Sequence, residues 1–231
     1  MNKLLGFRAC AGVLSTALLI GACVSTPHRE PQEPTAAASA GSAGTGLVEG
    51  YAAAIKAASD RSDHESDAKA RADLATQASN NAAACLAVDP HAAACQYGKA
   101  VATGLEARAH PGRAVGLLGS MLRSLEDAEK TDPNYDKAGP ARVMALVLIR
   151  APSWPLGPGD TDAGLAAARR AVALQPDYPP NILALAEALS KTGDASGARE
   201  SYVRARDLAQ SLPSGPERDD WLHEAADGLH L

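Results

Sequence analysis

The chain has 231 residues and a formal net charge of −5; hydrophobic residues make up 46% of it, but aromatic residues only 3%. The acidic balance, without a basic stripe, argues against a nucleic-acid partner. The apolar content is largely alanine, which is the best helix former and buries little area per residue. We therefore expect an all-α protein whose core is spread over many close helix contacts in an extended or stacked architecture.

The first 22 residues have the pattern of a bacterial lipoprotein signal peptide. Lys3 and Arg8 precede an apolar stretch that is too short for a confident membrane span. The stretch ends in LIGAC, residues 19–23, which resembles the lipobox. By that resemblance Cys23 is lipidated and anchors the protein to a membrane through acyl chains. Val24, rather than Asp, in the next position favours the outer membrane and its periplasmic face; an ordinary signal peptide with a chance cysteine is the alternative.

Residues 23–46 lack apolar periodicity and are rich in Pro, Ser and Gly, so we expect a disordered tether there. Residues 47–231 form the predicted helical domain. Its helices are expected near residues 47–59, 66–88, 91–109, 113–131, 139–151, 161–175, 179–192, 195–211 and 216–229.

Two cysteines remain once Cys10 leaves with the signal peptide and Cys23 is acylated. Cys85 and Cys95 are an even pair in an oxidising compartment, separated by a turn at Asp89-Pro90. We expect a disulfide between them. The alternatives are two small buried residues in alanine-rich helices and a metal site of Cys95 with His91, which lacks further ligands.

The chain contains internal repeats. Pro90, Pro133 and Pro176 follow similar small-residue segments at intervals of 43 residues, and residues 159–174 align with 193–208 at an offset of 34 residues. Thirty-four residues is the period of the tetratricopeptide repeat (TPR), a helix–turn–helix unit.

One segment resembles the TPR pattern of small and large residues almost in full. The matching residues are Ile182, Leu185, Ala186, Leu189, Gly193, Asp194, Ala198, Tyr202 and Ala205. The small residues allow close helix crossing, the large ones fill the gaps, and Gly193 ends the first helix. We predict a TPR-like superhelix of about four helix pairs, closed by a C-terminal capping helix that contains Trp221.

The sequence shows no catalytic constellation. It contains no nucleophile elbow, no H-E-x-x-H zinc motif and no phosphate-binding glycine loop, and its six histidines are scattered. We therefore predict no enzymatic activity, no cofactor and no metal site. A helical-repeat domain instead offers a concave surface for binding.

Three segments of the second half resemble a particular family of lipoproteins. They are AGPARV at 138–143, APSWPLGPGD at 151–160 and the stretch from Arg170 to Glu187. The chain resembles the T-components of tripartite ATP-independent periplasmic (TRAP) transporters over roughly residues 75–210. The resemblance implies a TPR-like scaffold, which could form a homo-oligomer, docks a periplasmic solute-binding protein and carries a ligand-sized channel. A general envelope scaffold that binds peptides or assembly factors, and a purely structural lipoprotein, are the alternatives.

The candidate contact residues lie in and around the proline-rich segment 151–160. They are Trp154, Leu156, Asp160, Tyr135, Arg142 and Asn181. Prolines would pre-organise such a loop for contact, although a loop packed over neighbouring helices needs the same rigidity. Arg142 and Asn181 stand near the starts of two first helices, which line the concave face of such repeats. The simpler interpretation is that Asn181 is a capping residue and Arg142 a surface charge.

Overall fold

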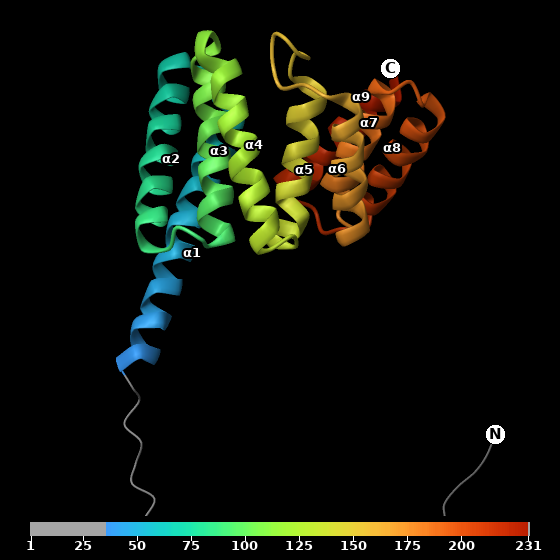
Figure 1. Ribbon diagram of the computed structural model, residues 1–231. Helices are drawn as coiled ribbons and strands as arrows, with labels where there is room; N and C mark the ends of the chain where they lie inside the picture. Colours follow the sequence, from blue (N-terminus) through green and yellow to red (C-terminus); the bar gives the residue numbers. More distant parts are fainter. Residues whose placement is uncertain (1–35, 231) are drawn as a thin grey trace, which may run out of the picture. The chain divides into compact units, whose positions relative to one another are not determined.

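The computed structural model describes residues 36–230, which are helical apart from connecting turns (Figure 1). The predicted signal peptide, the predicted lipidation site Cys23 and residues 23–35 of the predicted tether lie outside the described residues. Nine α-helices and one 3-10 turn lie within the described range, which holds no strand. They are α1 (Ala36–Asp63), α2 (Ala68–Val88), α3 (Ala93–Ala109), η1 (Pro111–Arg113), α4 (Ala114–Thr131), α5 (Tyr135–Arg150), α6 (Thr161–Leu174), α7 (Pro179–Lys191), α8 (Ala195–Gln210) and α9 (Pro216–His230).

Helix α1 begins earlier than the sequence indicated. It starts at Ala36, whereas the tether was predicted to continue to residue 46 and the first helix to begin at 47. The segment AAASAGSAGTG contains enough alanine to extend the helix in spite of its glycines and serines. Residues 36–46 are therefore helical, and the prediction of a tether there was wrong.

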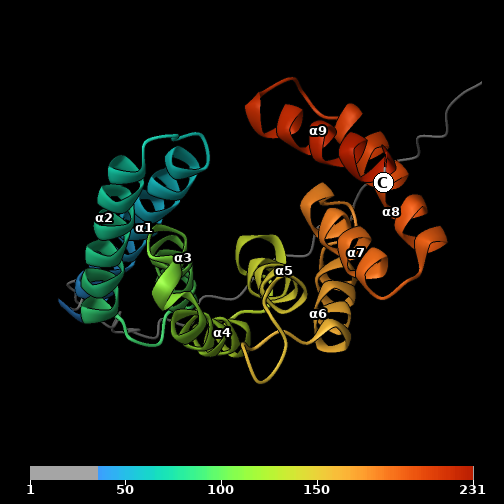
Figure 2. The same ribbon diagram turned by 90° about the horizontal axis from the view of Figure 1, so that it is seen from above.

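The helices form successive antiparallel pairs, α1/α2, α3/α4, α5/α6 and α7/α8, followed by α9. Within the compact unit Ala36–Leu231, first helices also contact one another: α1 packs on α3, α5 on α7 and α7 on α9, with a smaller contact between α3 and α5. Figure 2 shows these first helices on the inner side of a curved row and α2, α4, α6 and α8 on the outer side. The predicted arrangement of four pairs and a capping helix is confirmed.

The last pair shows why the repeat pattern specifies this packing. Ile182, Ala186, Ala198, Tyr202 and Ala205 are buried in one cluster, against which α9 packs with Ala225 and Trp221. The first helix of the pair ends before Gly193, which has a φ of 88° and so adopts the left-handed conformation that glycine favours. Asp194, the next residue of the repeat pattern, caps α8: its side chain accepts a hydrogen bond from the Gly197 amide at 2.9 Å.

The turn between α2 and α3 brings the two domain cysteines together. Both side chains are fully buried, the Cα atoms lie 5.3 Å apart, and the sulfur atoms are joined as a disulfide. The bond connects the end of α2 to the start of α3, the position expected from the sequence. Its formation in the cell remains a prediction.

None of the helices within residues 36–230 is both long enough and apolar enough to cross a membrane.

The close approach of α5 and α6 depends on Gly164, and we predict that G164A destabilises the protein. A Cβ atom there would lie 2.5 Å from Ile149 Cγ2 and 3.3 Å from the Ala145 carbonyl oxygen. We expect a loss of about 1–3 kcal/mol in the free energy of unfolding, measured by urea denaturation.

G116A is the matched control, because a Cβ atom at Gly116 meets nothing within 4 Å and the residue is exposed in α4. This variant should be neutral or gain up to about 1 kcal/mol from helix propensity. Equal stability of G164A and wild type would contradict the close packing of α5 on α6.

Candidate functional site

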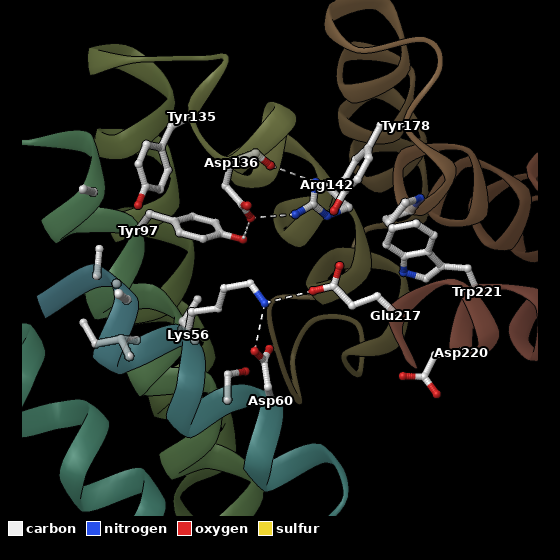
Figure 3. A pocket seen from close by; sticks show the side chains of 18 residues that line it. Lys56, Asp60, Tyr97, Tyr135, Asp136, Arg142, Tyr178, Glu217, Asp220 and Trp221 are labelled. Carbon is white, nitrogen blue, oxygen red and sulfur yellow. Dashed lines mark hydrogen bonds and ion pairs between the residues drawn. The ribbon is translucent and has the colours of Figure 1, made fainter. Parts of the chain in front are cut away.

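The inner face of the helix row contains a cavity of about 420 Å³ (Figure 3). It is lined by side chains from α1, α3, α5, α7 and α9, which are the first helices of the four pairs and the capping helix. Residues that are 161 positions apart, Lys56 and Glu217, meet at its edge. The cavity is therefore a product of the superhelix and not of any single repeat.

Aromatic rings are concentrated in this cavity. Tyr97, Tyr135, Tyr178 and Trp221 line it, although the whole chain has only eight aromatic residues, counted as two Trp, five Tyr and one Phe. Tyr97 and Tyr135 meet edge to face at 5.4 Å, and Tyr178 meets Trp221 in the same way at 5.7 Å. Half of the aromatic residues of this alanine-rich chain therefore line one cavity, where they form a candidate contact surface.

The sequence contained a signal for two of these rings. Tyr135 and Tyr178 each stand two residues after a repeat proline, Pro133 and Pro176, and so occupy the same place in successive repeats. Tyr135 was among the predicted contact residues, whereas Tyr97, Tyr178 and Trp221 were not. The missed signal was the scarcity of aromatic residues elsewhere in the chain.

Asp136 is the central acceptor at the back of the cavity. Its Oδ2 atom accepts hydrogen bonds from the Tyr97 hydroxyl and from Arg142 Nη2, each at 2.8 Å. Burial raises the pKa of Tyr97 far above its ordinary value, although the nearby Arg142 opposes the shift. The hydroxyl therefore keeps its proton and remains a donor to Asp136.

Asp136 reaches this position because the chain turns in an unusual way in the first residues of α5. Asp136, Lys137 and Ala138 have φ values of 47°, 54° and 63°, which place three consecutive non-glycine residues in the left-handed region. Each such residue costs about 1–2 kcal/mol, so surrounding contacts must hold the turn. Arg142 Nη1 donates to the Asp136 and Lys137 carbonyl oxygens, each at 3.2 Å, and thereby supports it.

Asn181 supports the same turn from α7. It is completely buried, its Oδ1 atom accepts from Arg142 Nη1 at 3.0 Å, and its Nδ2 atom lies 3.1 Å from the Lys137 carbonyl oxygen. Nδ2 is also within hydrogen-bonding distance of the Ala171 and Gln175 carbonyl oxygens at the end of α6. Asn181 is thus a capping residue for α6 and, at the same time, a support for Arg142.

A charged contact connects the two ends of the helix row. Lys56 on α1 donates to Asp60 Oδ2 at 2.8 Å and to Glu217 Oε1 on α9 at 3.2 Å. The hydrogen bond to Asp60 is the main cause that raises the pKa of Lys56 above its usual value. All three side chains are more than half exposed, so this contact contributes little to stability. The sequence did not single out Lys56, Asp60 or Glu217 as contact residues.

The six predicted contact residues fall into two groups. Tyr135 and Arg142 line the cavity, and Asn181 holds Arg142 in place, so Arg142 is a buried charge and not the surface charge of the simpler interpretation. Trp154 and Leu156 instead stand on the α5–α6 loop, 87% and 72% exposed. Asp160 caps α6 by accepting from the Ala163 amide at 2.9 Å.

The α5–α6 loop is fixed at its base by backbone hydrogen bonds, and its tip is exposed. The Gly159 amide donates to the Pro152 carbonyl at 2.8 Å, and the Asp160 amide to the Leu148 carbonyl at 2.9 Å. A side chain at Gly159 would collide with the Ala151 carbonyl oxygen, so the close return of the loop requires glycine. Trp154, at the exposed tip, neither lines the cavity nor belongs to the buried core.

A second cavity, of about 470 Å³, extends the first along the inner face. The two share Ser59, Tyr97 and Val101, and the second ends at Pro152, at the base of the α5–α6 loop. Together they form a groove on the inner face, which we call the inner groove. Its far part is lined mainly by aliphatic residues of α3, α4 and α5.

The chain resembles a solved structure, TTC0263, a thermophilic TPR protein in Thermus thermophilus. The TM-score is 0.54, with 24% sequence identity over 85% of this chain and 100% of that one. The described domain has a TPR-like fold. This confirms the fold class predicted from the 34-residue offset, whereas no protein-family model and no curated protein matches the sequence.

We predict that N181A destabilises the TPR-like domain strongly. Removal of the amide leaves the carbonyl oxygens at the end of α6 and the buried Arg142 guanidinium without this partner. We expect a loss of about 2–4 kcal/mol in the free energy of unfolding, measured by urea denaturation.

N80A is the control, because Asn80 is exposed on α2 and its loss should change stability by less than about 0.5 kcal/mol. Similar stability of N181A and N80A would show that the network around the left-handed turn is not required by the fold.

Proposed function

We propose that this protein is a lipid-anchored scaffold of the bacterial outer membrane, faces the periplasm, and binds a partner protein in its inner groove. The proposed partner is the solute-binding protein of a TRAP-type transporter. The TPR-like fold supports a role in protein–protein interaction. The lipobox-like LIGAC supports the anchor, and the segments at 138–143 and 151–160 support the T-component role.

One observation carries the binding role: the inner groove combines a continuous concave surface with four aromatic rings. Tyrosine and tryptophan are enriched among the few residues that dominate binding energy in protein interfaces, because they bury a large area at low entropic cost. The rings lie on the face that helical-repeat proteins use for binding. The exposed Trp154 and Leu156, on a loop that is fixed at its base, form a second proposed contact surface.

We predict that filling the inner groove abolishes partner capture. Ala53 is exposed and lines the cavity, whereas its neighbour Ala54 is exposed on α1 and does not line it. A53W should therefore weaken binding by at least about tenfold, whereas A54W should bind as wild type does. Binding is measured by pull-down of the periplasmic solute-binding protein from solubilised envelope and by titration with that purified protein.

The outcomes separate the proposed partner from the alternative. If A53W loses capture and W154A does not, the inner groove is the docking surface. If W154A also loses capture, the α5–α6 loop is part of the docking surface as well. Absence of any solute-binding protein under all growth conditions would overturn the transporter role. Capture that neither A53W nor W154A changes would overturn both surfaces.

We also predict that C23A releases the protein from the membrane fraction. Without the lipidated cysteine the chain loses its acyl anchor, which contributes about 0.8 kcal/mol per buried CH₂ group. Mass spectrometry of wild type should show an acylated N-terminal Cys23, and fractionation should place it in the outer membrane. C10A is the control, because Cys10 lies within the predicted signal peptide. An unmodified Cys23 in a membrane-bound wild-type protein would contradict lipidation.

A further inference from the structure

The charges that line the first cavity are unbalanced. Four carboxylates line it, from Asp60, Asp136, Glu217 and Asp220, but only two cations, Lys56 and Arg142. Arg142 is committed to Asp136, Asn181 and two carbonyl oxygens, and so belongs to the supporting structure. Of the remaining carboxylates, Asp60 and Glu217 share the ammonium group of Lys56. Asp220 lies 3.9 Å from Nε2 of His64, which does not line the cavity.

The aromatic rings that line the cavity also favour a positively charged ligand. The faces of tyrosine and tryptophan rings attract cations, and Tyr178 already shows this behaviour, with Lys137 Nζ at 4.9 Å and Arg142 Cζ at 5.2 Å from its centroid. Lys137 does not line the cavity. The rings of Tyr97 and Trp221 stand on opposite sides of the space above Lys56 and Glu217 (Figure 3). A cation in that space would meet aromatic faces and carboxylates together.

Lys56 occupies the position that such a cation would take. Its ammonium group lies between Asp60 and Glu217, on a side chain that is 59% exposed. The backbones of α1 and α9 do not pack against each other within the described residues. Side-chain ion pairs, Lys56–Glu217 and that of His64, just after α1, with Asp220, connect the two regions. An exposed ion pair contributes at most about 1 kcal/mol, so an incoming cation can replace Lys56 at Glu217.

We propose that the first cavity binds a basic side chain, an arginine guanidinium or a lysine ammonium, from an extended segment of the partner protein, in competition with Lys56. The inference rests on the proposed function, because the partner supplies the cation. A peptide fits better than a free cation, since the cavity continues into the aliphatic part of the inner groove, where flanking residues of the segment can lie. An anionic group would meet the carboxylate excess.

The test uses a blocked pentapeptide with one central arginine flanked by alanines, titrated into the full-length protein in detergent. Fluorotryptophan labelling gives two fluorine NMR signals, one from Trp221 in the cavity and one from Trp154 on the exposed loop, assigned with W154F. We expect the Trp221 signal alone to shift, with a Kd on the order of 1 mM. Peptides with citrulline or glutamate at the centre should bind at least about threefold more weakly.

Two variants with matched controls test the competition. K56Q removes the resident cation and should tighten arginine-peptide binding by at least about twofold, whereas K69Q, which breaks the similar exposed Lys69–Asp73 pair on α2, should not. E217Q should weaken binding by at least about threefold, and E200Q on α8 should leave it unchanged. If Lys56 only stabilised the fold, K56Q would not tighten binding of the arginine peptide.

Equal binding of the citrulline and arginine peptides, or weaker binding in K56Q, would overturn the cation site. Binding of free arginine amide as tight as that of the peptide would overturn the peptide as its occupant. These outcomes are independent of the proposed partner, because the probe is a synthetic peptide. If A53W abolishes partner capture but the arginine peptide does not bind in preference to the citrulline peptide, the proposed scaffold function is retained and the proposed cation site is rejected.

Discussion

The left-handed turn at residues 136–138 is the constraint on which the inner face depends. Its three strained residues are held by Arg142 and Asn181, which belong to α5 and α7 and also connect to the end of α6. Through Asp136 the same network reaches Tyr97 on α3. A single hydrogen-bonded group therefore sets the relation of four helices and the back wall of the cavity.

Alanine-rich packing explains why so many of the chain's aromatic and charged side chains can line the inner groove. Small side chains bring helices close together, as at Gly164 against α5, and alanines make up much of the buried core. Large residues can then be placed on the inner face without disturbing the core. Four rings and six charged groups consequently line one cavity, and the exposed Lys56–Glu217 pair is the weak connection across its mouth.

The repeat pattern predicted the local structure well because its causes are local. Gly193 and Asp194 act within a few residues of their own positions, as a helix end and a cap. The start of α1 was missed because the glycines and serines of residues 36–46 were taken as decisive, although the surrounding alanines favour a helix. Trp154 and Leu156 were identified as unusual, but their outward direction depends on how the loop returns to Leu148.

The sequence by itself determined the helices, their pairing and the TPR-like class, because periodicity and turn residues act over short distances. It also pointed to Arg142 and Asn181, although not to their shared role. Only the tertiary structure decided the site. Tyr97, Lys56 and Glu217 come from three different helices and carry no common motif, and the curvature of the superhelix brings them together. Such curvature sums small rotations between successive repeats, which no single repeat encodes.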